Sequence, residues 1–320
     1  MIFPPRSWPA FRILLFLSAL IPAFEGYASQ RVLFIGNSFS LGWQTPVAGY
    51  DADHVHDLNS TNYGGVPAVF KDLATEGGYD VDVSVEAVPG STLSDHLTWD
   101  RDWLGQRKWD WVVLQDLSTR PLPTEYGGNI PQFLQDVSAI HDLIQSANPD
   151  VRTALYETWA RPDLVPGRVP SLQAMQDALH RSYSLAANTI GSAEMVPVGD
   201  AFMAAIDHGL ADDPTTDATE GAINLWSADR YHASAIGSYL SALMFYSTIL
   251  HGNPMTLPTG ESSTAANLGI PSTVASELED LVAQTAPSVS TVPEPSSSEL
   301  LAMACLLGGL VRARRFFRRS

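Results

Sequence analysis

Residues 31–38 read Arg31-Val32-Leu33-Phe34-Ile35-Gly36-Asn37-Ser38, an apolar run of strand length that ends in a glycine and two small polar residues. Runs of similar composition recur along the chain at 81–87, 111–114, 153–156 and 195–198. Segments with helical period separate or follow them at 66–76, 130–146, 171–188 and 233–250. Strands that are apolar throughout bury both faces, which requires helices on each side of a parallel sheet. We therefore predict a three-layer α/β/α sandwich with a five-stranded parallel sheet, whose ligand crevice lies at the carboxyl ends of the strands.

The composition limits the class of protein. A chain of 320 residues suffices for one substantial core, so one folded domain at 29–255 is the simplest arrangement. The formal net charge of −17 argues against a nucleic-acid partner, because phosphate binding requires a surplus of Lys and Arg. The single cysteine, Cys305, lies outside that domain, which can therefore form no disulfide and no thiolate metal site.

The first 28 residues read as a secretory signal peptide. Arg6 and Arg12 precede an apolar run at 13–24, and small residues at 26–28 supply a cleavage site. The alternative is a short membrane anchor, but roughly a dozen apolar residues are too few to span the hydrocarbon core. We therefore expect export of the protein.

The composition changes again after the domain. Residues 256–292 are rich in Ser, Thr, Pro and Ala and read as a linker, with an amphipathic patch at 272–284 that predicts a terminal helix. Residues 293–320 contain Pro293-Glu294-Pro295, then an apolar stretch, then a basic cluster. This order resembles the PEP-CTERM sorting signal of Gram-negative bacteria.

That resemblance implies a path to the cell exterior. The segment would associate transiently with the inner membrane and be processed by an exosortase-type enzyme, and the protein would be released to the cell surface, outer envelope or extracellular matrix. The alternative is a weak C-terminal anchor or an amphipathic end helix.

A candidate nucleophile lies directly after the first predicted strand. Ser38 occupies a strand-to-helix turn, where its backbone N–H can stabilise an oxyanion, and Gly36 permits the tight turn. The alternative role for Ser38 is a helix cap, since Asn and Ser are both good N-cap residues.

A candidate base lies almost two hundred residues later, ahead of the helix predicted at 233–250. His232 near neutral pH is suited to take the proton of a serine hydroxyl, and Asp229, three residues earlier, can hold its Nδ1–H. By themselves, these two residues would equally fit a surface pair at a helix start.

These segments resemble conserved blocks of the SGNH (GDSL-like) hydrolases. Gly36-Asn37-Ser38 is similar to their first block, with Asn37 where many members carry Asp, and the stretch 229–240 is similar to their last block. The resemblance extends over residues 31–252. It is greatest to a branch whose third block reads Val-Val-Leu-Gln rather than Gly-x-Asn-Asp. In this sequence the block is Val112-Val113-Leu114-Gln115. The family has a flavodoxin-like sheet.

The resemblance implies a role for each matching residue. Ser38 would be the nucleophile and the first oxyanion N–H donor, and Gly90 would be the second. Asp229 and His232 would complete the triad. Gln115 stands where the family has an oxyanion-donating Asn, but its side chain is one methylene longer, which puts that role in doubt.

The loop after the fourth predicted strand also faces the expected crevice. Trp159 and Arg161 in this loop are candidates to line a substrate pocket. The alternative is ordinary loop packing.

Other kinds of site have weaker support in the sequence. Residues 51–57 concentrate Asp and His, but no third ligand stands at an established metal spacing, so a solvated acidic loop is the favoured interpretation. The remaining histidines, His96 and His180 among them, show no partner pattern. The phosphate-loop motifs and GxSxG are absent. We predict no metal and no cofactor.

The sequence therefore favours an exported serine esterase or deacetylase, plausibly acting on O-acetyl groups of a polysaccharide through an acyl-serine. Two alternatives stay open: a non-catalytic protein that binds matrix glycan, and an O-acetyltransferase that uses the same triad. The acyl-chain length, the sugar and the oligomeric state do not follow from the sequence.

Overall fold

The computed structural model describes residues 29–285, apart from 44–45, 100, 106–108 and 218–221. The predicted signal peptide and the predicted sorting signal lie outside the described residues. Among the described residues, no helix combines the length and the hydropathy needed to cross a membrane.

The core of the fold is one parallel sheet with the order β2-β3-β1-β4-β5-β6. Its strands are β1 (Gln30–Gly36), β2 (His56–Asp57), β3 (Val81–Ala87), β4 (Trp111–Leu114), β5 (Arg152–Glu157) and β6 (Ala193–Pro197). The five predicted strands are all present, and without β2 their order is the flavodoxin-like one. The prediction of five strands was wrong by one, because β2 is a two-residue polar edge strand with no apolar run to reveal it.

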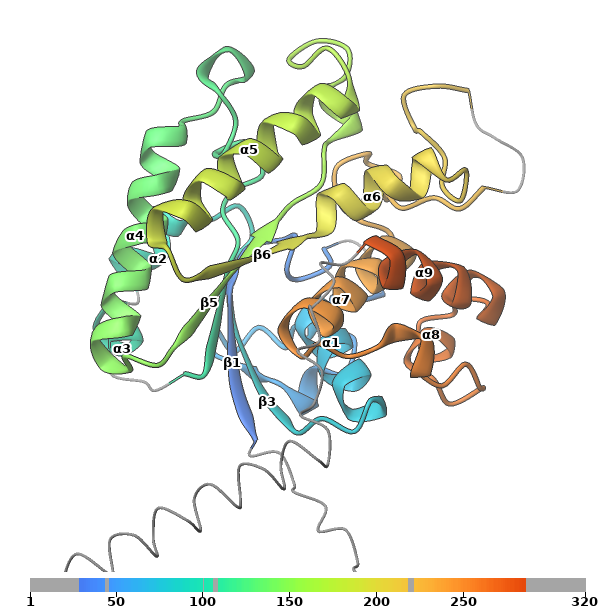
Figure 1. Ribbon diagram of the computed structural model, residues 1–320, viewed down its shortest axis with the longest axis horizontal. Coiled ribbons are helices and arrows are strands. Elements are labelled where there is room, and N and C mark those ends of the chain that lie inside the picture. Colours follow the sequence, from blue (N-terminus) through green and yellow to red (C-terminus); the bar gives the residue numbers. More distant parts are fainter. Residues whose placement is uncertain (1–28, 44–45, 100, 106–108, 218–221, 286–320) are drawn as a thin grey trace, which may run out of the picture.

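Helices cover both faces of this sheet, as predicted (Figure 1). Figure 1 shows α4 and α5 on one side and α1, α7 and α9 on the other. The helices are α1 (Gly65–Glu76), α2 (Leu93–Trp99), α3 (Arg101–Leu104), α4 (Ile130–Ala147), α5 (Leu172–Ile190), α6 (Val198–Asp207), α7 (Ala235–Ile249), α8 (Thr264–Asn267) and α9 (Ser272–Thr285). Within the described residues, short 3₁₀ turns lie at Ala52–His54, Thr124–Tyr126, Pro162–Leu164 and Pro254–Thr256.

Local sequence explains where the long helices begin. Asn129, Ser171 and Ser234 each precede a helix and accept a hydrogen bond from the backbone N–H three residues later. This satisfies one of the amide donors that a helix start leaves unpaired. Helix α7 is apolar on nearly all sides and is buried accordingly, between α1, α6 and α9. Helix α9 packs on α6 and α7, so the packed unit includes the terminal helix predicted at 272–284.

A buried carboxyl group joins the end of β4 to the start of α2. Asp116 is fully buried, and its Oδ1 accepts from the backbone N–H groups of Leu93 (3.1 Å) and Leu117 (2.7 Å). Burial raises the pKa of Asp116 to about 6, although these two hydrogen bonds oppose the rise.

Ionisation of Asp116 should make stability depend on pH. Its pKa is raised in the folded state, so its contribution is lost as the pH rises through about 6. The displacement from the ordinary value of 3.8 corresponds to roughly 3 kcal/mol at full ionisation. We expect Asp116→Asn, which keeps the accepting oxygen, to lose less stability than the wild type between pH 4 and pH 7 in urea unfolding. Equal losses in the two proteins would contradict this account.

Gly65 lets α1 start against the turn that carries Ser38. Its φ is +65°, and a Cβ there would lie 2.5 Å from the carbonyl oxygen of Ser40. Gly78 also has a positive φ, of +80°, but a Cβ there would meet nothing within 4 Å.

The two glycines form a matched pair for a stability test. We expect both Gly65→Ala and Gly78→Ala to carry the cost of a positive φ, about 1 kcal/mol. Gly65→Ala should cost about 1–3 kcal/mol more, because its methyl group overlaps the backbone. Denaturant unfolding of both variants measures the difference, and similar losses would show that α1 can move away without cost.

Candidate active site

Two distant segments meet at the carboxyl end of β1. The Oγ of Ser38 lies 3.0 Å from Nε2 of His232, although 194 positions separate the two residues. Nδ1 of His232 lies 2.7 Å from Oδ2 of Asp229. Ser38 and His232 are 7% and 6% exposed, so the pair is shielded but reachable. The structure thus brings the three predicted residues into one hydrogen-bonded chain.

The loop before α7 fixes the direction of that chain. Oδ1 of Asp229 accepts from the backbone N–H groups of Tyr231 and His232, both at 3.0 Å. Burial alone would raise the pKa of Asp229, but the hydrogen bonds from the His232 side chain and from these two amides outweigh it and lower the pKa. An ionised carboxylate only accepts, so Nδ1 of His232 carries a proton and Nε2 is free to accept the proton of Ser38.

A stack of aromatic rings packs against the His232 imidazole. The Phe39 ring packs edge-on against the His232 ring, with 5.7 Å between the ring centroids. It stacks on the Trp159 ring at a centroid distance of 4.2 Å. Trp159 is fully buried, stacks on Phe202 as well and donates its Nε1–H to the carbonyl oxygen of Tyr231. The prediction that Trp159 lines a substrate pocket was therefore wrong, because its ring is enclosed in the core behind His232.

Arg161 lies close to the same loop, with 13% of its side chain exposed. Its guanidinium covers the Tyr231 ring at 3.5 Å, pairs with Asp163 at 2.6 Å and donates to the Oγ of Ser118 at 3.1 Å. The pairing with Asp163 compensates its charge. Arg161 therefore stays a candidate for the rim of the site, but not as a free cation.

Two backbone amides near the triad are available to donate a hydrogen bond. Neither the Ser38 N–H nor the Gly90 N–H donates a hydrogen bond to another group in the described part of the chain. Gly90 is exposed, and its φ of +81° is a conformation that glycine adopts at little cost. The loop of Gly90 is fastened to the turn of residues 37–40, called here the Ser38 turn, because Asn37 Nδ2 donates to the carbonyl oxygen of Ser91 at 3.0 Å.

Gln115 does not have the predicted freedom to act as a third donor. Its Nε2 group donates one hydrogen to Oδ1 of Asn37 at 3.0 Å and the other to the carbonyl oxygen of Asp116. Its Oε1 accepts from the Asn37 N–H and from the Oγ of Ser40, both at 3.0 Å. The longer side chain thus uses its polar atoms on Asn37 and Ser40 of the Ser38 turn and on the backbone of Asp116. The structure thus corrects the predicted oxyanion role: Gln115 orients Asn37.

A second buried network, which the sequence did not reveal, underlies the Gly90 loop. Nε2 of His96 lies 2.8 Å from the Oγ of Ser91 and 2.9 Å from the carbonyl oxygen of Gly36. Its Nδ1 lies 2.5 Å from Oε2 of Glu86, and both side chains are almost completely buried. A carbonyl oxygen only accepts, so Nε2 must carry a proton. His96 therefore joins the end of β1 to the loop that carries Gly90.

The acidic segment 51–57 does not gather its side chains at one point. His54 pairs with Asp51 at 2.6 Å, whereas His56 pairs with Asp82 at 2.9 Å. Asp57 instead accepts backbone hydrogen bonds from the residues that follow it. The segment is thus organised by local pairs and turns.

The sequence matches no protein-family model and no curated protein. Among solved structures, a DUF4886 family protein from Bacteroides uniformis aligns with a TM-score of 0.53 at 16% identity, over 80% of this chain and 94% of its own. A protein from Slackia heliotrinireducens, provisionally described as an SGNH hydrolase, gives a TM-score of 0.49 at 22% identity, over 69% and 100%. A family 3 carbohydrate esterase from Clostridium thermocellum gives 0.45 at 16% identity, over 70% and 96%. The first of these similarities shows a shared fold.

Proposed function

We propose that the protein is a serine hydrolase of the SGNH type that cleaves ester bonds through an acyl-serine. One observation carries this proposal: the chain from Ser38 Oγ to His232 Nε2 at 3.0 Å and from His232 Nδ1 to Asp229 at 2.7 Å. A serine, a histidine and an ionised carboxylate in this order are what a serine alcohol needs to become a nucleophile.

The geometry supports a two-step reaction. His232 Nε2 accepts the Ser38 proton as Oγ attacks the ester carbonyl, and the proton then passes to the leaving alcohol. Water, deprotonated by His232 in turn, attacks the acyl-serine, which releases the acid and restores Ser38. The N–H groups of Ser38 and Gly90 are the proposed donors to the oxyanion in both steps, and the Asn37–Gln115 pair holds the turn in place.

For the substrate we propose an O-acetyl group on a neutral polysaccharide, met outside the cell. The formal charge of −17 disfavours anionic substrates, and Arg161 is compensated by Asp163. The signal peptide and the sorting signal read from the sequence support export, exosortase-type processing and a location at the cell surface or in its matrix.

Substitution of the triad tests the proposal. With p-nitrophenyl acetate and longer esters, we expect Ser38→Ala and His232→Ala in the full-length protein to lower kcat by about 10³-fold or more. Asp229→Asn should lower it by about 10²–10⁴-fold, because the histidine loses its fixed tautomer. A fluorophosphonate should label the wild type but not Ser38→Ala.

The exposed residues Ser146 and His208 supply matched controls. Ser146→Ala and His208→Ala should keep full turnover and labelling. Turnover that persists in Ser38→Ala would refute the proposal. Transfer of the acetyl group to an added sugar, in preference to water, would identify a transferase with the same triad.

The buried network under Gly90 should affect the rate without contacting substrate. Ser91→Ala removes the contacts of its hydroxyl with His96, Gly36 and Val88, so the Gly90 N–H should lose its fixed position. We expect kcat to fall roughly ten- to a hundredfold with little change in KM.

Thr98→Ala is the matched control for Ser91→Ala, because its exposed hydroxyl bonds only within α2. It should leave kcat unchanged. A folded Ser91→Ala protein with wild-type kcat would show that the network does not position Gly90.

A further inference from the structure

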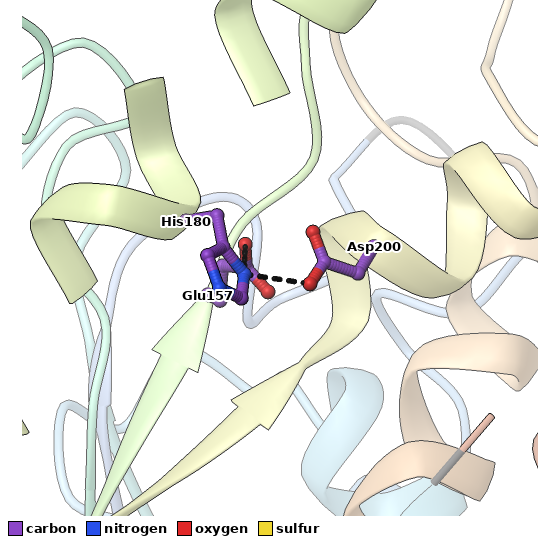
Figure 2. A group of neighbouring side chains, drawn as sticks. All are labelled: Glu157, His180 and Asp200. Carbon is purple, nitrogen blue, oxygen red and sulfur yellow. Dashed lines mark hydrogen bonds and ion pairs between the residues drawn. The ribbon is translucent and has the colours of Figure 1, made fainter. Parts of the chain in front are cut away.

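A second cluster of titratable side chains lies beyond the triad, where β5, α5 and α6 meet (Figure 2). Nδ1 of His180 lies 2.7 Å from Oδ2 of Asp200 and 3.6 Å from Oε1 of Glu157. One ligand atom from each residue lies within 4.8 Å of the other two. Figure 2 shows the imidazole of His180 beside Glu157, with Asp200 facing it from the start of α6.

Glu157 is the member of the cluster that has a buried oxygen without a hydrogen bond to a described residue. It is fully buried, and its Oε1 accepts from Nε2 of Gln176 at 2.8 Å. Its Oε2 has no hydrogen-bond partner among the described residues. Burial and the neighbouring charge of Asp200 raise the pKa of Glu157 well above its ordinary value. Two adjacent carboxyl groups in this setting require a proton or a cation between them.

The donor set selects among cations. One imidazole nitrogen and two carboxylate oxygens match the ligands of Zn²⁺ and related first-row ions, whereas Ca²⁺ and Mg²⁺ prefer oxygen alone. Bonds of about 2.0–2.2 Å in a tetrahedral site place ligand atoms roughly 3.3–3.6 Å apart. The 3.6 Å contact between His180 and Glu157 has that spacing, whereas the 2.7 Å hydrogen bond between His180 and Asp200 would have to lengthen by roughly 0.6 Å to admit an ion. The side chains of His180 and Asp200 are 45% and 39% exposed, which leaves an entry path from solvent.

We propose that Glu157, His180 and Asp200 form a binding site for a divalent first-row transition-metal ion of the Zn²⁺ type. The three side chains supply three ligands, and a water molecule completes the coordination. This site is separate from the triad, and the proposal does not depend on the esterase activity.

The surroundings of the cluster indicate a stabilising role for the ion. Gln176 contacts Glu157 at 2.8 Å and Asp200 at 3.3 Å, and its Oε1 accepts from the Ala160 N–H at 2.9 Å. Ala160 directly follows Trp159, which stacks on Phe39 and donates to the carbonyl oxygen of Tyr231 next to His232. An ion would therefore join β5, α5 and α6 and, through Gln176, fasten the loop behind His232.

Calorimetric titration tests the site in the full-length, chelator-treated protein near pH 7.5. We expect one equivalent of Zn²⁺ to bind and to raise the Tm, whereas Mg²⁺ at the same concentration should do neither. Glu157→Gln and His180→Ala should weaken Zn²⁺ binding at least about tenfold. His54→Ala is the matched control, because His54 also pairs with an Asp, at 2.6 Å, but outside the cluster. It should bind Zn²⁺ like the wild type.

Two further measurements separate loss of the site from other failures. Glu157→Gln keeps the oxygen that Gln176 contacts but removes an ionisable buried group, so its metal-free form should melt at or above the wild-type Tm while no longer responding to Zn²⁺. Ser38→Ala should bind Zn²⁺ normally, whatever its esterase activity. The proposal would be overturned by the absence of saturable Zn²⁺ binding, by equal binding of Mg²⁺, or by binding that Glu157→Gln and His180→Ala do not weaken.

Discussion

The pairing of β1 between β3 and β4 is the constraint on which the rest of the molecule depends. Residues of β1 pair with β3 on one side and with β4 on the other, and the three strands run parallel. Parallel pairing brings the carboxyl ends of these strands to one edge, so the loops that follow them become neighbours although they are distant in sequence. The Ser38 turn, the Gly90 loop and Gln115 are juxtaposed for this reason.

Side chains behind the turn convert this rough juxtaposition into fixed geometry. Asn37 contacts Gln115 and the carbonyl oxygen of Ser91, and His96 contacts Ser91 and Gly36. Each of these groups is buried and satisfied by another, so moving one loop would leave polar atoms unpaired. The site is thus positioned mainly by hydrogen bonds to backbone atoms, with an aromatic stack beneath the histidine.

The sequence predicted the parts of the fold that depend on local patterns. Continuous apolar runs identified the five main strands, and helical periodicity located α1, α4, α5 and α7. It also marked Ser38, Asp229 and His232 as candidates, because each stands at a loop after a strand or before a helix, but only the resemblance to the SGNH blocks favoured a triad over a helix cap and a surface pair. Helix α6 was not predicted, since it is a short apolar segment that directly follows β6 and has no turn before it.

The remaining parts depend on contacts between distant elements. Gln115 follows β4 and bonds to Asn37, which follows the neighbouring strand β1. Its side chain is one methylene longer than that of Asn, and the sequence does not show that this extra length directs the amide to the Ser38 turn. Trp159 lies in a loop but is buried, because its ring fits between Phe39 and Phe202. The pairing of Glu86 with His96 and that of Glu157 with His180 each join a strand to a separate helix, with no fixed spacing for a pattern to detect.

The sequence around Ser38 lacks the GxSxG motif whose serine occupies a sharp, strained turn in α/β-hydrolases. Ser38 is also not among the described non-glycine residues with a positive φ, so its main chain carries no strain of that kind. Strain at a reactive position couples activity to stability, because removing the strain stabilises the protein but can lower its activity. At Ser38 no positive-φ strain is present to create that coupling. The side chain at this position can therefore be exchanged without releasing backbone strain of that kind.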